Sequence, residues 1–479
     1  MTGQLLGTLP FTAGKIKMPK LRLKNSFPSP LNLMTAVLCF SFAVALAKPA
    51  IAYLTDHKEI RAEFTTDFGF PMAWATTNHD NAELVDHTIG LDFLCEDVYV
   101  RAAGATLRLY TQISPEEVTS RVYGFPPLMA VVKLWILFLP TPKAMAVWAL
   151  LVLLSVFLCS FYSLKLFRKF PSPGKSPYEY HSLVFLSFLF TFSYPSLFSF
   201  ERGGNDITVL WLILAACYGF MKKRWWLVGA SMMIAALLKI FPGVALAAVL
   251  FAAGTAIFGS FFEKDSTVKT TLRKNAFQVL VGAALAAVAA IFPLWEAYRY
   301  YFTKQIFLIS KNLMKFFSTD TGINHSLKTA FGNQGYAIGG FLFFCGALAL
   351  AFFVYGLWKS KKEDAILKYQ SLFSLTYLSL LCVYLPNINS FDYNLILGIP
   401  FFCLVVFTPD SPQKKLITVA SAVLLLGMTL PRWMSACFWP ENGKRYSFFL
   451  VLQLAGLVPL AVSQLWMVFS NRRTGKQPA

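Results

Sequence analysis

The chain has 479 residues, of which 56% are hydrophobic and 14% are charged, and its mean hydropathy is +0.55. Soluble globular proteins carry about 25% charged residues, so this composition excludes that class. It indicates a membrane protein that crosses the bilayer several times.

Apolar runs long enough to cross a hydrocarbon core of about 30 Å recur along the chain. The runs 225–241 and 243–260 have no polar linker, but together they would form a helix of about 54 Å, too long for one bilayer. The chain is therefore predicted to turn near Lys239 and Pro242. The sequence predicts an all-α integral membrane protein, a single domain over 1–479, with about twelve transmembrane helices at 32–54, 144–164, 181–200, 206–221, 225–241, 243–260, 276–295, 337–358, 369–386, 393–409, 416–432 and 447–470.

The segment 126–141 is apolar but short, is bracketed by prolines and contains Lys133. If it lies in the membrane plane, the basic N-terminus 1–31 and the other predicted cytoplasmic segments carry 25 of the 43 lysines and arginines but six of the 24 acids. Basic residues near span ends stay cytoplasmic, so this distribution predicts an in-plane helix at 126–141 and two cytoplasmic termini. The net charge of +19 then reflects orientation and not nucleic-acid binding.

Two features have alternative interpretations. Residues 15–47 are predicted to begin a signal anchor, and a cleavable signal peptide is the alternative. Cys95 and Cys437 are the two cysteines predicted to lie on the outer side. The alternatives for them are a disulfide with each other and two unpaired thiols. The other six cysteines lie in or at the ends of apolar runs and are predicted to be small core residues.

The predicted first outer loop, 55–142, is the most acidic part of the chain. It contains twelve of the 24 Asp and Glu residues. Its central motifs are Gly-Leu-Asp92-Phe, then Glu96-Asp97-Val-Tyr-Val-Arg101-Ala-Ala, and then Tyr123-Gly-Phe-Pro-Pro-Leu. A carboxylate in this position is suited to removing a proton from a hydroxyl group.

Polar motifs also occur at the outer ends of later spans. Lys239 lies beside a Pro-Gly break, where the alternatives are a functional contact and a lysine that snorkels to the interface. Arg202 precedes two glycines that would allow a ligand to approach the backbone, and an ordinary polar turn is the alternative. The motifs are Phe-Glu201-Arg202-Gly-Gly-Asn205-Asp206 between the third and fourth spans, Lys239-Ile-Phe-Pro at the end of the fifth, Asn324-His325-Ser-Leu in the second outer loop at 296–336, and Asn-Ser-Phe-Asp392-Tyr-Asn near the ninth.

The order and outer placement of these motifs resemble the GT-C superfamily, and most closely its polyprenol-phosphate-mannose-dependent alpha-1,2-mannosyltransferases, glycosyltransferase family 87. The resemblance implies that a first-loop carboxylate is catalytic and that an interfacial helix begins at the Pro-Pro-Leu stretch. The motif spacing in this loop departs from the family pattern, so Asp92 and Asp97 both stay candidates for the catalytic base. The implied substrate-binding residues are Glu96, Arg101, Tyr123, Glu201, Arg202, Asn205, Asp206, Lys239, Asn324, His325 and Asp392.

The resemblance implies transfer of a hexose, most simply mannose, from a polyprenyl-phosphate-sugar donor to a glycolipid or envelope glycan acceptor. Direct displacement predicts inversion at the anomeric carbon. We expect no cofactor and no metal, because the first loop has no Asp-x-Asp pair and the donor would be a lipid phosphate. The expected partners are the donor, the acceptor and membrane lipid, without nucleic acid, and the expected location is a bacterial plasma membrane.

Two other function classes fit a chain of this kind. A transporter or lipid flippase also has about a dozen spans, but it usually places ionisable residues near the bilayer midplane. Here the charges lie at span ends and in outer loops. A glycan polymerase or ligase that uses a pyrophosphate-linked donor is the third alternative, and it would rely on arginine and histidine more than on an early carboxylate.

Overall fold

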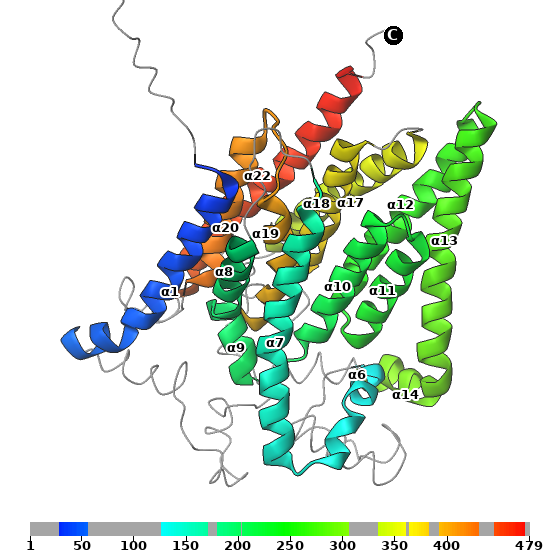
Figure 1. Cartoon of the computed structure of the whole chain (residues 1–479). Helices are drawn as coiled ribbons and strands as arrows, with labels where there is room; N and C mark the ends of the chain where they lie inside the picture. The colour runs from blue at the N-terminus through cyan, green and yellow to red at the C-terminus, as the bar shows by residue number, and fades with distance from the viewer. Residues whose placement is uncertain are drawn as a thin grey trace, which may run out of the picture.

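A computed structural model describes residues 28–55, 126–170, 180–202, 204–305, 334–360, 364–382, 392–430 and 445–474. Within these ranges the chain forms helices and turns and no β-strand, so the predicted all-α class is confirmed there. The longer helices form a bundle in which successive helices run up and down (Figure 1). They are α1 (Pro30–Thr55), α7 (Thr141–Phe167), α8 (Tyr180–Thr191), α10 (Asp206–Met221), α11 (Trp225–Leu238), α12 (Pro242–Phe262), α13 (Ser266–Ile291), α17 (Gln334–Lys359), α18 (Ala365–Leu381), α20 (Lys414–Thr429) and α22 (Arg445–Thr474).

Shorter helices complete the bundle. Two of them, α6 and α14, lie beside each other at its lower end in Figure 1. The shorter elements are α6 (Pro127–Val132), η2 (Leu134–Phe138), α9 (Tyr194–Arg202), η3 (Phe292–Leu294), α14 (Trp295–Tyr300), η4 (Tyr301–Gln305), η6 (Asp392–Gly398) and α19 (Ile399–Val405).

Helices occupy all twelve predicted apolar runs, in part or in full. Within the described ranges, five helices are long and apolar enough to cross a membrane, which supports a membrane protein but not the count of twelve spans. These five are Thr141–Phe167, Pro242–Phe262, Ser266–Thr303, Ala337–Lys359 and Val451–Ser470. Several other runs form apolar helices of 10–17 residues, among them α10 and α11.

Two predicted elements differ from the structure. The run 181–200 is two helices, because the chain turns between α8 and α9, where the hydroxyls of Ser193 and Ser196 donate to the carbonyl oxygen of Phe190. The segment 126–141 is not one helix. It divides into α6 and η2 at Lys133, whose backbone leaves the helical region at φ −101° and ψ 7°. In contrast, the predicted turn between 225–241 and 243–260 is confirmed, since α11 ends at Leu238 and α12 begins at Pro242.

The densest helix contact joins α11 and α13. An ideal Cβ on Gly229 would lie 2.0 Å from the carbonyl oxygen of Val279, and one on Gly282 would lie 2.0 Å from that of Trp226. Both distances are far below van der Waals contact, so the two backbones touch directly. Small residues permit such close approach in membrane helices, where dispersion contacts replace the hydrophobic effect.

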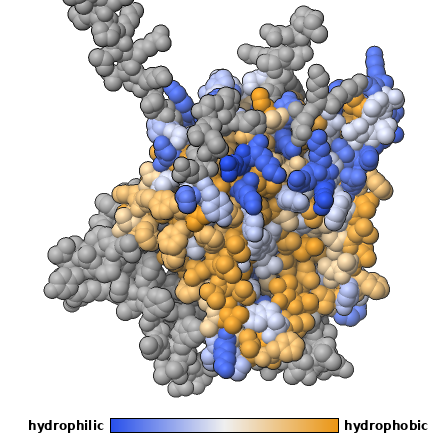
Figure 2. Space-filling model, in the orientation of Figure 1, coloured by the Kyte–Doolittle hydropathy of each residue, from blue (hydrophilic) through white to orange (hydrophobic). Residues whose placement is uncertain are grey.

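Charged side chains gather at the end of the bundle that lies uppermost in Figure 1. We call this the basic end, and Figure 2 shows its hydrophilic surface above a broad hydrophobic belt. The start of α1 and the end of α22 both lie there. Its described lysines and arginines are Lys165, Arg168, Lys169, Lys222, Lys223, Arg224, Lys264, Lys269, Arg273, Lys274, Lys359, Lys368, Lys414 and Lys415.

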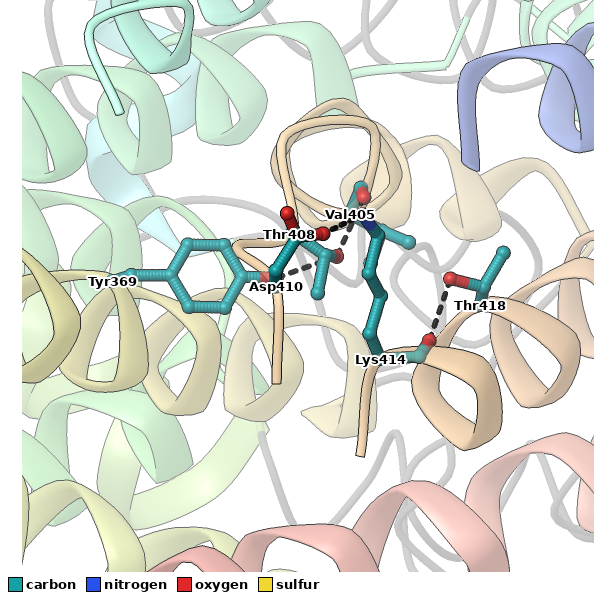
Figure 3. Close-up of polar contacts among 6 residues, drawn as sticks. All are labelled: Tyr369, Val405, Thr408, Asp410, Lys414 and Thr418. Atoms are coloured by element: carbon teal, nitrogen blue, oxygen red, sulfur yellow. Dashed lines mark hydrogen bonds and ion pairs between the residues drawn. The ribbon is translucent and has the colours of Figure 1, made fainter. Parts of the chain in front are cut away.

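Polar contacts at the basic end secure the connection between α19 and α20 (Figure 3). The hydroxyl of Thr408 donates to the carbonyl oxygen of Val405 at 2.6 Å, and its oxygen lies 2.9 Å from the hydroxyl of Tyr369 on α18. Lys414 forms an ion pair with Asp410 across the turn. These contacts hold the α19–α20 connection against α18.

Candidate functional site

A buried ion pair lies at the end of the bundle opposite the basic end. We call this the α6 end: it comprises α6, α14, the start of α10 and the end of α11 (Figure 1). The Nζ atom of Lys239 donates to Oδ1 of Asp206 at 2.6 Å, and the two side chains are 7% and 0% exposed. The Lys239 ammonium also lies 5.0 Å from the ring centroid of Phe241. Both paired residues belong to the predicted substrate-binding set.

Local helix chemistry explains why these two residues meet. Asp206 occupies the first turn of α10 and Lys239 is the C-cap of α11, and each charge is favoured by the helix dipole at its position. The helices are antiparallel neighbours, so the start of α10 and the end of α11 lie at the same end of the bundle.

The turn that joins α10 to α11 is a Schellman motif. Lys223 adopts a left-handed conformation with φ 57°, and its N–H donates to the carbonyl oxygen of Phe220. The N–H of Arg224 donates to the carbonyl oxygen of Gly219 at 2.7 Å. This closed pattern ends α10 without a glycine at the left-handed position and reverses the chain within three residues.

A second cation, which the sequence did not mark as a site residue, is buried nearby. Lys133 joins α6 to η2 and is 0% exposed. Its Nζ atom lies 4.4 Å from the ring centroid of Trp148 on α7, and Trp148 stacks on Trp135 at 6.2 Å. Such a cation–π contact stabilises a desolvated ammonium. The signal in the sequence was a single lysine inside a short apolar run bracketed by prolines.

A small apolar cluster attaches α6 and α14 to the end of α11. Leu237 of α11 packs with Ala290 of α13 and Tyr298 of α14, and Leu128 of α6 packs against them. The hydroxyl of Tyr298 also donates to the carbonyl oxygen of Leu237 at 3.0 Å. Leu237 lies two residues before Lys239. Contacts from α6, α13 and α14 therefore fix the end of α11, which carries this cation.

Three other predicted site residues lie on elements that meet at this site. Glu201 and Arg202 are the last residues of α9, and Asp392 is the first residue of η6. The η6 helix packs against both α9 and α10. Asn205, the N-cap of α10, is buried beside Asp206. The structure thus brings together the elements that carry these residues and the Asp206–Lys239 pair.

The remaining predicted site residues lie outside the described residues. They are the two catalytic candidates and five substrate-binding candidates: Asp92, Asp97, Glu96, Arg101, Tyr123, Asn324 and His325. Cys95 and Cys437 also lie outside these ranges. The six described cysteines are free thiols, and five of them are buried, as predicted for small core residues.

The described geometry can hold an anionic group. Lys239 offers an ammonium whose position is set by a carboxylate and an aromatic ring, and the surrounding burial strengthens its electrostatic interactions. Among the described residues, no group of three His, Cys, Asp or Glu side chains is arranged to hold a metal ion.

This protein is a bundle of apolar helices with a buried ion pair at one end, and it therefore belongs to the class of helical integral membrane proteins. The sequence profile of glycosyltransferase family 87 matches residues 123–383, more than half of the chain. The chain therefore belongs to glycosyltransferase family 87 and is a membrane glycosyltransferase. Comparisons with curated proteins and with solved structures give no match.

Proposed function

We propose that this glycosyltransferase moves a hexose, most simply mannose, from a polyprenyl-phosphate-sugar donor to a glycolipid or envelope glycan acceptor. The reaction takes place at the extracytoplasmic face and inverts the anomeric carbon. Family membership supports sugar transfer, and the observation that carries the donor class is the buried Lys239 ammonium at the α6 end. A lipid phosphate that leaves during transfer develops negative charge, which a fixed cation stabilises.

The charge distribution supports the orientation. Cytoplasmic loops of membrane proteins are enriched in lysine and arginine, so the basic end faces the cytoplasm and the α6 end faces outward. Both chain termini are then cytoplasmic, since the start of α1 and the end of α22 lie at the basic end. In this proposal about twelve helices span a bacterial plasma membrane, and 126–141 lies along its outer surface.

The chemistry needs a base as well as a cation. A hydroxyl of the acceptor attacks the anomeric carbon, and a first-loop carboxylate, Asp92 or Asp97, takes its proton. A new C–O bond forms while the bond to the phosphate oxygen breaks, and the electron pair leaves with the lipid phosphate. Lys239 receives that phosphate. The donor and acceptor are held by the other predicted binding residues, Glu96, Arg101, Tyr123, Glu201, Arg202, Asn205, Asp206, Asn324, His325 and Asp392.

Purified protein in liposomes tests the proposal directly. With a polyprenyl-phosphate-mannose donor and extracted envelope glycolipids, we expect mass spectrometry to show a product heavier by one hexose, and NMR to show inverted configuration. Asp92→Asn or Asp97→Asn should abolish transfer, whereas Glu116→Gln, a matched control in the same loop, should retain it. EDTA should have no effect. Retained configuration, or solute uptake without any glycan product, would contradict the proposal.

A further inference from the structure

At the basic end, α12 and α13 meet in a corner that exposes aromatic rings beside cations (Figure 1). Arg273 of α13 fixes the relative height of the two helices, because its Nε atom donates to the hydroxyl of Ser260 on α12 at 3.0 Å. Its guanidinium also lies 4.9 Å from the ring centroid of Phe261. We call this surface the α12–α13 corner, and it comprises Phe258, Phe261, Phe262, Lys264, Arg273 and Lys274.

The aromatic half of the corner is a continuous apolar surface. Phe258, Phe261 and Phe262 are 66%, 63% and 72% exposed, and all three belong to the last turns of α12. The rings of Phe258 and Phe262 contact each other with their centroids 5.1 Å apart. An exposed apolar patch of this kind indicates an apolar partner.

The cationic half of the corner is open to a ligand. Its lysines and arginine are all exposed. The two acids of the α12–α13 turn make other contacts: Glu263 pairs with Lys359 of α17. The carboxylate of Asp265 accepts the N–H of Thr267 at 2.9 Å and so caps α13. In the described part of the chain, no carboxylate forms an ion pair with the three cations of the corner.

Arg273 is oriented to bind an anion through two donors. The hydroxyl of Ser260 accepts from its Nε atom, and the ring of Phe261 lies beside the guanidinium. The terminal amino groups are left to bind a ligand, and such a pair of donors matches two oxygen atoms of a phosphate group. Lys274, the next residue, adds a second positive charge.

From this geometry we infer that the α12–α13 corner binds an anionic phospholipid of the leaflet that surrounds the basic end. The phosphate of the headgroup contacts Arg273 and Lys274, and the acyl chains lie against the exposed phenylalanine rings. Basic surfaces between membrane helices bind anionic headgroups in this way. The lipid site lies at the end of the bundle opposite the Asp206–Lys239 pair and adds to the proposed function.

Charge and polarity together favour a lipid over other occupants. A soluble anion would neutralise the cations but leave the rings without an apolar partner. A second copy of this chain could cover the rings, but its own corner would bring the same cations into the contact, and like charges repel. A phospholipid such as phosphatidylglycerol supplies both an anion and apolar chains.

Native mass spectrometry of the full-length protein in detergent micelles tests this site. The probes are dioleoyl-phosphatidylglycerol and dioleoyl-phosphatidylcholine, which have the same acyl chains but differ in net charge. The charge variant combines Arg273→Gln with Lys274→Gln. The ring variant is Phe262→Ala, which removes an exposed ring that is separate from the Arg273–Phe261 contact.

The chain offers a matched control for the charge variant. Arg168→Gln combined with Lys169→Gln removes the same two residue types, in the same order, from another exposed position at the basic end. The phenylalanines on either side of them, Phe167 and Phe170, are 0% and 5% exposed. The control therefore removes equal charge where the adjacent rings are buried.

Wild type and the control should bind phosphatidylglycerol about twentyfold more tightly than phosphatidylcholine, since each cation at a membrane surface contributes about fivefold. In the charge variant we expect the two lipids to bind within about twofold of each other. Phe262→Ala should weaken the binding of both lipids by about threefold, because both have acyl chains. A residue with only a structural role would not change the ratio of the two affinities.

Equal loss of the phosphatidylglycerol preference in the charge variant and in the control would overturn the inference, because any cations at the basic end would then suffice. Competition by the soluble headgroup glycerophosphoglycerol would also overturn it, since the chains would then be dispensable. A wild-type dimer that forms without lipid and that Phe262→Ala dissociates would assign the corner to a second copy instead.

If the charge variant does not fold, cross-linking of a photoactivatable phosphatidylglycerol to wild type decides. Labelling within 258–274 would support the inference, and labelling confined to other segments would overturn it. Sugar transfer is not a readout of either experiment, so a negative result leaves the proposed function intact.

Discussion

The hydroxyl of Tyr298 donates a 3.0 Å hydrogen bond to the carbonyl oxygen of Leu237, which lies 61 residues earlier in the chain. The last four carbonyl groups of a helix have no partner within it, and Leu237 is one of these in α11. Tyr298 thus caps α11 from a different element. This hydrogen bond anchors the start of the second predicted outer loop to Leu237. Leu237 lies two residues before Lys239, the cation of the candidate site.

Tyr298→Phe removes this hydrogen bond and preserves the packing of the ring. We expect a loss of about 1 kcal/mol in stability, since a buried carbonyl group loses its partner. Thermal unfolding in detergent measures the loss. Tyr180→Phe on α8, where the side chain is 59% exposed, is the matched control and should have no effect. Equal unfolding temperatures for Tyr298→Phe and wild type would show that this contact does not stabilise α11.

The buried ion pair should behave differently from an exposed one. Lys239→Met leaves the Asp206 carboxylate buried without its ammonium, which typically costs about 3–5 kcal/mol. Adding Asp206→Asn should restore much of that stability, because the uncompensated charge is gone. Thermal unfolding of the two single variants and the double variant measures the coupling.

The matched control for that cycle is the Lys359–Glu263 pair at the basic end, where Lys359 is 49% exposed. Lys359→Met should cost about 1 kcal/mol or less, because solvent screens exposed pairs. Equal losses for the Lys239 and Lys359 variants would contradict the assignment of the Asp206–Lys239 pair as a desolvated interaction.

The contact between α11 and α13 should be intolerant of a single methyl group. In Gly229→Ala the added Cβ would meet the Val279 carbonyl oxygen at 2.0 Å, so the helices must separate. Overpacking of this kind costs about 1–3 kcal/mol. Gly254→Ala and Gly340→Ala are controls, because an added Cβ there meets nothing within 4 Å. If all three variants unfold at the wild-type temperature, the backbones are not in contact.

Acid should weaken the contact between α12 and α17. A hydrogen bond from Lys359 lowers the pKa of the Glu263 carboxyl below its ordinary value of 4.5. A carboxyl whose pKa is depressed on folding stabilises the protein above its unfolded pKa, and this contribution is lost as the pH falls through the folded pKa. Glu263→Gln should therefore show a smaller decrease in unfolding temperature below pH 4.5 than wild type.

Glu296→Gln is the control for the acid experiment, since Glu296 forms an exposed pair with Arg299. This variant should follow the wild-type acid profile. A Glu263→Gln profile that matches wild type at every pH would exclude a contribution from this pair.

Sequence patterns predicted the helical class and the turn at Lys239, because hydropathy and a Pro-Gly break are local signals. They also placed Asp206 and Lys239 at outer span ends. Their pairing was not predicted, since a 2.6 Å contact between residues 33 positions apart depends on the lengths and crossing of two helices. The break between α8 and α9 was missed because serine hydroxyls bonded to Phe190 replace helical contacts without lowering the average hydropathy much.

Lys133 illustrates a different limit of sequence reasoning. The residue was noted as an obstacle to membrane crossing, and its burial depends on a tryptophan supplied by another helix. No local pattern reports such a tertiary contact. The catalytic choice between Asp92 and Asp97 stays a prediction, since both residues lie outside the described ranges.

The short length of the α10–α11 hairpin affects the surrounding lipid. With 16 and 14 residues, these helices rise about 24 Å and about 21 Å, less than a hydrocarbon core of about 30 Å. When the Schellman turn sits at one boundary, the open end of the hairpin stops several ångströms short of the other. Hydrophobic mismatch of this kind thins the adjacent leaflet. Lipid headgroups would thereby be drawn toward the open end of the hairpin, at the α6 end, and acyl-chain length becomes a variable that tunes access to it.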